Sequence, residues 1–289
     1  MIRRDLSPTL IREEIMKKVE MVLAYYKEAD QLQRYIDAAV EHSYEITIYN
    51  KGPVPPKPEN PEPNLLSLKY FSLRARRQFP VGTRTINLPN IGVQTHTYLH
   101  HIVSRYESLA DITIFALGSG FRGRKKSHKT EWLLRHARQC RGFASAHIYL
   151  SVFDDYDFLM PIYKPASGSE TIENKKAEPR PLGQWIVKHT GHQLNEKNRF
   201  FIRSTKDTFA VTKEVIRQRP LSYWQELLSQ VSNSDEGYNL EVTHFFERAW
   251  LLILFPSQST QAFIEYSYPP YIPTTVLCWD TERYGDKLY

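Results

Sequence analysis

A run of cations between glycines is the most concentrated chemical feature of the sequence. Residues 119–129 read SGFRGRKKSHK and hold five Lys or Arg side chains. Such a loop binds phosphate through its charges and through backbone N–H groups. A solvated surface loop has the same composition, so both interpretations stay open. The cations that would bind phosphate are Arg122, Arg124, Lys125 and Lys126.

A pair of carboxylates separated by one residue follows at Asp155 and Asp157. Hard carboxylate oxygens suit Mg²⁺ or Mn²⁺, either of which would offset the charge of a phosphate leaving group. Aspartates at this spacing are also common in surface turns, and we favour that interpretation. In a metal-free site, the cations of residues 122–126 would supply the positive charge instead.

Three histidines, His96, His100 and His101, lie in a predicted helix. His96 and His100 are four residues apart and share a face, as metal-binding pairs do. No third ligand is apparent nearby. We therefore expect these histidines to form hydrogen bonds within the core or to a ligand, in preference to binding zinc.

The stretch that positions these groups is residues 85–120, which predict a strand, a turn, a helix and a second strand. Asn90 and Gly92 lie at the turn, and the helix after it carries apolar residues spaced for one buried face. The run ADITIFAL, residues 110–117, is typical of a strand that is covered on both faces. Open α/β sheets bind ligands at the carboxyl ends of such strands. We therefore place the active site there.

The residues before this stretch predict a β-α-β unit, with strands at 19–25 and 44–49 and a helix at 27–40. This order favours parallel strands joined by a right-handed crossover. The first strand is followed by Tyr25-Tyr26-Lys27-Glu28, so the glycine-rich dinucleotide fingerprint is absent. Further elements are predicted as helices at 130–139, 222–231 and 240–255, a strand at 146–153, and a strand-turn-strand at 199–211.

The predicted organisation is one domain over residues 21–255, preceded by an N-terminal helix within residues 1–20. Residues 53–80 form a Pro-rich insertion whose Arg74, Arg76 and Arg77 either bind an anionic partner or membrane surface or, as we favour, are solvated. We expect residues 163–198 to be irregular or mobile and residues 256–289 to lie across the surface as a tail.

Composition limits the class of protein. The chain has 289 residues, 41% of them hydrophobic and 13% aromatic, which is typical of a folded globule. Its net charge of +6 fits a phosphate-bearing ligand, an anionic membrane surface or nucleic acid. The first residues lack the pattern of a signal peptide, and the two cysteines lack metal-ligand spacing. We expect a soluble cytoplasmic protein, with peripheral membrane contact as a further expectation.

Five segments of the chain resemble one known family, the domain of unknown function DUF3431, which looks related to glycosyltransferases of the GT-A type. The most specific is LPNIGVQTHTYLHHIVSRYESLADITIFALG, where Gln94 stands in place of the family's usual Glu. At the end of its strand, Ala-Leu-Gly-Ser replaces the usual Leu-Gln-Gly pattern. The other segments are MVLAYYKEADQLQRYI, YEITIYNKG, DTFAVTKEVIRQRPLSYWQELL and HFFERAW.

The resemblance implies an α/β, GT-A-like fold related to the Rossmann fold, with a mixed, mostly parallel sheet flanked by helices. It also implies transfer of a sugar from a nucleotide-sugar donor to a glycan or other hydroxyl acceptor. Glu247 is then the candidate catalytic base, with Asp207 as second choice. The implied donor-binding residues are Tyr25, Lys27, Glu28, Asn50, Lys51, Asn90, Gly92, His96, Gly118, Ser119, Arg122, Arg124 and Lys125.

Two other functions remain open. The turn after the strand at 110–117 has no carboxylate, which favours a non-catalytic relative that binds a carbohydrate or nucleotide. Nucleic-acid binding through the two basic stretches is the less favoured alternative, and we expect no nucleic acid as partner.

Overall fold

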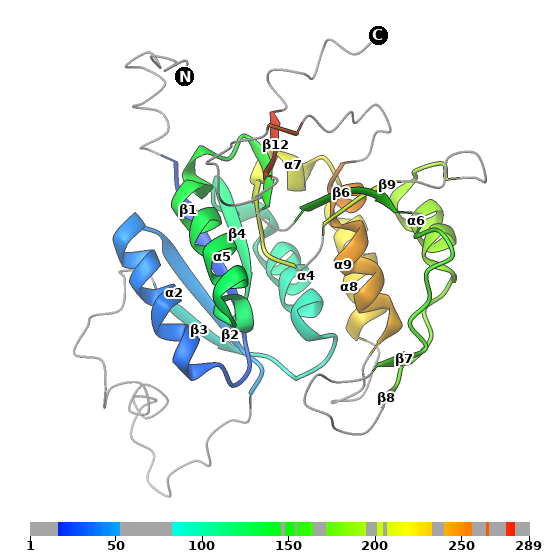
Figure 1. Ribbon diagram of the computed structural model, residues 1–289, viewed down its shortest axis with the longest axis horizontal. Helices are drawn as coiled ribbons and strands as arrows, with labels where there is room; N and C mark the ends of the chain where they lie inside the picture. Colours follow the sequence, from blue (N-terminus) through cyan, green and yellow to red (C-terminus); the bar gives the residue numbers. More distant parts are fainter. Residues whose placement is uncertain are drawn as a thin grey trace, which may run out of the picture.

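The strands that the sequence predicts most clearly form the middle of one large sheet. In the computed structural model (Figure 1), β1 (Val19–Tyr25) lies between β2 (Glu45–Asn50) and β4 (Ile112–Leu117) and is parallel to both. The three strands are rich in β-branched and apolar residues, which suit a sheet buried on both faces. The structure describes residues 17–52, 83–145, 148–153, 155–163, 172–194, 201–204, 207–232, 240–255, 264–265 and 276–280.

The described part of this sheet has eight strands in the order β11-β12-β5-β10-β4-β1-β2-β3. Strands β3, β2, β1 and β4 run parallel, and β10 runs antiparallel between β4 and β5. The mixed, mostly parallel sheet that we expected is thus confirmed. The remaining strands are β3 (Arg84–Asn87), β5 (Gly142–Ser145), β10 (Phe209–Thr212), β11 (Ile264–Glu265) and β12 (Val276–Asp280).

Helices cover both faces because alternate residues of each strand point to opposite sides. Met21 and Leu23 of β1 join a core with α2 and α5, whereas Val22 joins a second core with α4, α6, α8 and α9. Figure 1 shows α2 and α5 together on one side of the sheet. The helices are α2 (Ala29–His42), α4 (Val93–Arg105), α5 (Arg124–His136), α6 (Leu182–Thr190), α7 (Lys213–Arg217), α8 (Leu221–Ser232) and α9 (Glu241–Leu254).

Aromatic side chains dominate the second core. Trp185, Trp224 and Trp250 are fully buried. The Trp250 ring lies 5.3 Å from Phe209 of β10, centroid to centroid, and 6.1 Å from Tyr98 of α4. Burying such large rings stabilises the contact between α9, the sheet and α4.

The strand predicted at 146–153 is present from residue 148 and lies outside the main sheet, while residues 146 and 147 are outside the described part of the chain. The main sheet takes the four buried residues of β5, and a separate strand, β6 (Ile148–Phe153), pairs with β9 (Phe201–Ser204). The strand-turn-strand at 199–211 is confirmed as β9 and β10, but its two strands belong to different sheets. Which strands pair depends on contacts distant in sequence, and a local pattern does not encode those contacts.

Two other segments are more regular than we expected. The helix predicted at 130 begins at Arg124, so much of the cationic run is helical, as the helix propensity of Lys and Arg allows. Within 163–198, α6 is a regular helix and Trp185 anchors it in the core. The remaining strands of this region, β7 (Ile162–Tyr163) and β8 (Ile172–Glu173), form a short antiparallel pair.

The sheet also extends beyond the boundary that we expected at residue 255, because β12 pairs with β5. The predicted N-terminal helix at 1–20 and the Pro-rich insertion with Arg74, Arg76 and Arg77 lie almost entirely outside the described residues. Among the helices that the structure describes, none has the length and apolar character needed to cross a membrane.

Candidate functional site

The order of the strands creates a crevice between β1 and β4. From β1 the chain passes to β2 and β3 on one side, and α4 then carries it back to β4 on the other side of β1. Ligands bind at such a switch point, outside the carboxyl ends of the strands. A cavity of about 730 Å³ opens there. It is lined by Ala24, Tyr25, Tyr26, Glu28, Lys51, Asn90, Gly92, Val93, Gln94, Leu117, Gly118, Ser119, Tyr163, Thr243, His244 and Glu247.

The cavity brings together eight of the residues singled out from the sequence: Tyr25, Glu28, Lys51, Asn90, Gly92, Gly118, Ser119 and Glu247. Other predicted binding residues lie apart from its lining. These are Lys27, Asn50, His96, Arg122 and Arg124, all within the described part of the chain. The side chain of Lys125 lies outside the described residues.

The turn after β1 is closed by Glu28. Its Oε2 accepts hydrogen bonds from the backbone N–H groups of Tyr26 and Lys27, both at 3.0 Å. Gly118 at the end of β4 lies against this carboxylate, since a Cβ there would come within 2.5 Å of Glu28 Oε2. The absence of a side chain at Gly118 lets the two turns lie this close without displacing the Glu28 carboxylate. Asn50 closes the turn after β2, where its Oδ1 accepts a hydrogen bond from Gly52 N at 3.1 Å.

The third wall is the start of α4. Gly92 adopts a left-handed conformation, with φ at +54°, and a Cβ there would come within 2.8 Å of Val231 O. Both constraints select glycine. The tight turn aims the first residues of α4, Val93 and Gln94, at the cavity.

Lys51 is a buried cation in the cavity wall. Its side chain donates hydrogen bonds to the backbone carbonyls of Ile91 and Val93. Burial lowers the pKa of Lys51 to about 7, because the interior disfavours its charged form.

The three histidines of α4 are largely core residues. Tyr49 Oη and His101 Nδ1 lie 3.0 Å apart in the interior. His96 is buried beside Lys51, and burial followed by the nearby charge of Lys51 lowers the pKa of His96 to about 4. Among the described residues, no cluster of three His, Cys, Asp or Glu side chains gathers to hold a metal.

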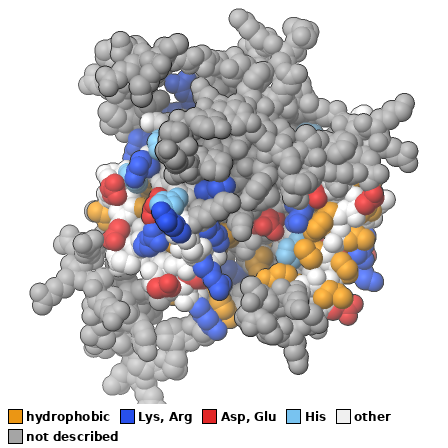
Figure 2. Space-filling view, in the orientation of Figure 1, with side chains coloured by type: hydrophobic (Ala, Val, Ile, Leu, Met, Phe, Trp, Pro, Cys, Tyr) orange, Lys and Arg blue, Asp and Glu red, His pale blue; other side chains and the backbone are white. Residues whose placement is uncertain are grey.

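Figure 2 shows Lys and Arg side chains gathered over α5, which follows the β4 turn. Arg122 and Arg124 are exposed on this surface. Lys126 instead contacts the lining of the cavity from outside: its Nζ donates a hydrogen bond to Ser119 Oγ at 3.1 Å. Lys126 is thus a cation of this run that a hydrogen bond ties to a residue of the lining.

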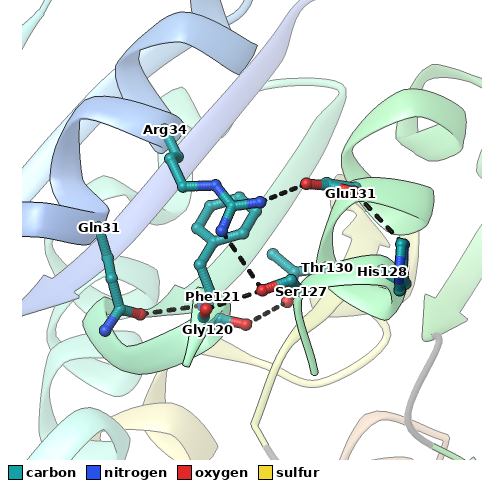
Figure 3. A network of polar contacts seen from close by, with 8 residues as sticks. All are labelled: Gln31, Arg34, Gly120, Phe121, Ser127, His128, Thr130 and Glu131. Carbon is teal, nitrogen blue, oxygen red and sulfur yellow. Dashed lines mark hydrogen bonds and ion pairs between the residues drawn. The ribbon is translucent and has the colours of Figure 1, made fainter. Parts of the chain in front are cut away.

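The β4 turn continues as the short 3₁₀ helix η2 (Gly118–Phe121), which a polar network fixes from behind (Figure 3). Gln31 of α2 accepts a hydrogen bond from Phe121 N at 3.0 Å. Ser127 and Thr130 of α5 donate to the carbonyls of Phe121 and Gly120 at 2.7 and 2.8 Å. The guanidinium of Arg34 stacks over the Phe121 ring, donates to Ser127 Oγ at 3.3 Å and pairs with Glu131.

The opposite wall comes from α9 and β7. Glu247 is about one third exposed, with His244 Nδ1 at 3.8 Å and Arg248 Nη1 at 3.9 Å from its Oε2. The Tyr163 ring stacks on His244 at 5.6 Å. The sequence analysis missed His244 and Tyr163. The spacing of His244 and Glu247, three residues apart on a predicted helix, was a signal that could have found the histidine.

Glu241, in the first turn of α9, ties the segment before α6 to this wall. The buried carboxylate accepts hydrogen bonds from Met160 N at 2.8 Å and Ala177 N at 2.9 Å, and from Arg180 at 3.1 Å. These bonds hold Tyr163, which lies between Met160 and Ala177 in sequence, over the cavity.

Asp207, the second candidate base, lies behind the wall. Its buried carboxylate accepts hydrogen bonds from Gln94 Nε2 and from Trp250 Nε1, the latter at 2.8 Å. Burial, followed by the charge of Glu247, raises the pKa of Asp207 to about 7. Asp207 lies outside the lining of the cavity, so it positions Gln94 and Glu247 is left as the candidate base.

A divalent cation at the cavity would need several carboxylate oxygens from the lining. Glu28 and Glu247 are the carboxylates in the lining, and one oxygen of Glu28 already accepts two backbone N–H groups. Asp155 and Asp157 belong to no metal-binding cluster among the described residues. Among the described residues, the carboxylates of the lining therefore do not make a preformed metal site.

Two solved structures resemble the chain at low similarity. Glucosyl-3-phosphoglycerate synthase from Mycobacterium tuberculosis, crystallised in complex with phosphoglyceric acid, is 10% identical, with a TM-score of 0.34 over 88% of this chain and 73% of that one. A second crystal structure, of a mycobacterial protein, is 12% identical, with a TM-score of 0.31 over 71% of this chain. The chain spans 56% of the length of that mycobacterial protein.

No curated protein matches the chain. A family model matches residues 80–267. This range includes α4 with Gln94, β4, and Glu241 and Glu247 of α9. The chain therefore belongs to the family described as a protein of unknown function, DUF3431.

Proposed function

We propose that this protein binds a nucleotide-sugar in the cavity and transfers the sugar to a hydroxyl group of a glycan or other acceptor. One observation carries the proposal: a single cavity at the switch point of the sheet joins the turns after β1, β2 and β4 to Glu247 of α9. Its volume of about 730 Å³ lies in the range of small-molecule sites.

The donor would lie along the ends of the strands. The turn of Tyr25 and Glu28 offers an aromatic ring and a carboxylate to a base and ribose. Gly118 and Ser119 allow the backbone to approach the diphosphate closely. The order of these contacts supports a nucleotide that runs from the end of β1 toward the end of β4.

Glu247 would act as general base in an inverting reaction. It removes the proton of the acceptor hydroxyl as that oxygen attacks the anomeric carbon, and the bond from this carbon to the phosphate oxygen breaks. The products are the glycosylated acceptor, a nucleoside diphosphate and a protonated Glu247. The neighbouring His244 and Arg248 support this role by orienting the carboxylate.

Glu247→Gln tests the base. The amide keeps the shape of the side chain but cannot take a proton, so turnover is expected to fall at least about 100-fold while donor affinity changes little. Transfer kinetics and calorimetric donor titration measure the two effects. Glu107→Gln, on an exposed residue after α4, is the control and should match the wild type. Unchanged turnover in Glu247→Gln would remove Glu247 from the reaction.

We further propose that lysines at the cavity, instead of a metal ion, offset the charge of the leaving diphosphate. The support is the poor fit of the carboxylates to a metal and the presence of Lys51 and Lys126. Transfer should then persist in excess EDTA. Loss of transfer in EDTA and its return with Mn²⁺ or Mg²⁺ would show that a divalent cation is required.

A non-catalytic role is the second candidate, favoured by the β4 turn, where residues 117–120 carry no carboxylate. Such a protein would bind a nucleotide-sugar without hydrolysing or transferring it. Prolonged incubation of the bound donor with an acceptor library, followed by mass spectrometry, separates the two functions. An intact donor in every reaction would favour the binding protein.

A further inference from the structure

The starting observation is the unused hydrogen-bonding capacity of Lys51. The side chain is only 5% exposed, yet it lines the cavity. An ammonium group has three N–H donors. Two of them bind the carbonyls of Ile91 and Val93, and the third has no partner among the described residues.

Lys51 also lacks a counter-ion among the described residues. Burial is the cause that lowers its pKa, with no carboxylate opposing it. The ionisable groups beside it on α4, His96 and His100, supply no negative charge: burial, followed by the charge of Lys51, lowers the pKa of both and favours their neutral form. Glu28, Glu247 and His244 line the same cavity from the other elements but form no ion pair with Lys51. A buried cation in such surroundings is unfavourable unless an anion joins it.

The backbone near Lys51 adds a second attraction for an anion. Gly92, Val93 and Gln94, at the start of α4, line the cavity beside it. The first intrahelical bond there runs from His96 N to Gly92 O, so the N–H groups of the preceding turn have no helical acceptor. These donors and the helix dipole favour negative charge at the position that the free N–H of Lys51 can reach.

We propose that Lys51 and the first turn of α4 form an anion subsite that takes a phosphate or pyrophosphate group. The inference deepens the proposed function, on which it rests for the identity of the natural ligand. It assigns one phosphate of the donor to the β2 and α4 side of the cavity.

Anion binding at this subsite is coupled to proton uptake. With a pKa of about 7, Lys51 is largely neutral at pH 8.5 and largely charged at pH 6. An anion binds the charged form, so its affinity falls as the pH rises through 7. Between pH 7.0 and 8.5 the affinity should weaken about tenfold, after correction for the ionisation of the ligand itself.

Calorimetric titration with inorganic pyrophosphate tests the subsite. Lys51→Met should weaken binding at least about tenfold, the loss expected for one charge-assisted hydrogen bond away from water. Lys188→Met, which removes an exposed cation of α6 outside the lining of the cavity, is the control and should bind within about twofold of the wild type. Equal loss of binding in both variants, or loss in neither, would overturn the proposal.

If the Lys51→Met variant fails to fold, a second measurement tests the subsite in the wild type. The wild type is titrated with pyrophosphate at pH 7.0 and 8.5, in buffers that differ in ionisation enthalpy. Proton uptake that increases with pH supports the subsite, and pH-independent affinity with no proton uptake contradicts it. Parallel titrations with a nucleoside diphosphate and a hexose phosphate identify the source of the phosphate.

The outcomes separate this inference from the proposed function. Pyrophosphate binding that depends on Lys51, without transfer from any nucleotide-sugar, leaves the subsite standing and removes the transferase. Transfer that is unchanged in Lys51→Met keeps the transferase and removes the subsite.

Discussion

At and behind the wall of the cavity, burial changes the pKa of two ionisable residues in opposite directions. Burial lowers the pKa of Lys51 and raises that of Asp207, and both shifts favour the neutral form. Lys51 contacts the cavity directly. Asp207 does not line the cavity and instead accepts hydrogen bonds from Gln94, which does, and from Trp250.

Asp207 should make the stability of the protein depend on pH. A carboxyl with a folded pKa of about 7 stays protonated while the unfolded chain ionises above about pH 4. Its contribution to the free energy of unfolding is therefore fully present at low pH and is lost as the pH rises toward 7. The amide of Asp207→Asn cannot ionise. Between pH 4.5 and 7, the free energy of unfolding of this variant should therefore rise by at least about 1 kcal/mol relative to that of the wild type.

Urea unfolding at several pH values measures this difference. Glu41→Gln, on an exposed residue of α2, is the control and should run parallel to the wild type. Parallel curves for Asp207→Asn and the wild type would mean that Asp207 is ionised in the folded protein.

The sequence was informative about residues that follow strands and about apolar burial, but uninformative about which ionisable side chains are buried. Tyr25, Glu28 and Gly118 could be placed at the cavity because a strand end can be recognised from its pattern. The burial of Lys51 and the enclosure of Asp207 depend on α4 and α9 packing around them. Those contacts join residues far apart in the chain, and no local pattern predicts them.

At the scale of elements, the short helix η2 is the part of the site most tightly held. Tyr35 of α2 donates a hydrogen bond to Leu117 O at 2.6 Å, and the network of Figure 3 holds the next residues. Gly120 leaves no room for a side chain, because a Cβ there would lie 1.9 Å from Tyr35 Oη. This packing fixes the floor of the cavity before any ligand binds.

Gly120→Ala tests this packing. The added methyl group must displace Tyr35, so the variant should lose about 2 to 3 kcal/mol of stability. Tyr35→Phe alone should lose about 1 kcal/mol, the worth of its hydrogen bond. With the hydroxyl removed, the double variant should be more stable than the sum of the two losses predicts. Additive losses, measured by chemical unfolding, would contradict the contact.

The helices and strands were predicted best where apolar residues recur with one regular spacing along the whole segment. The strand at 19–25 and the helices at 222–231 and 240–255 were confirmed to within a residue at each end, since each shows one clear pattern. The start of α5 was placed too late, because the glycines of residues 119–129 suggested a loop. β5 was missed, since four residues are too few to show alternation.

At the scale of the whole molecule, the two faces of the sheet have different roles: one supports the site and the other contributes side chains to it. The face with α2 and α5 holds η2 from behind, and the face with α4, α8 and α9 brings Gln94 and Glu247 to the cavity. On the face shown in Figure 2, Lys and Arg side chains gather over α5, whereas Lys51 is buried. On our proposal, phosphate recognition in the cavity would rest on Lys51 and not on this basic surface.

Co-crystallisation with UDP- and GDP-linked hexoses tests the central claim most directly. Our account predicts that one of these donors lies at the carboxyl ends of β1 and β4, with its diphosphate at Lys51 and its sugar facing Glu247. A donor bound elsewhere on the molecule, or crystals in which side chains of the protein fill the cavity at saturating donor, would contradict it.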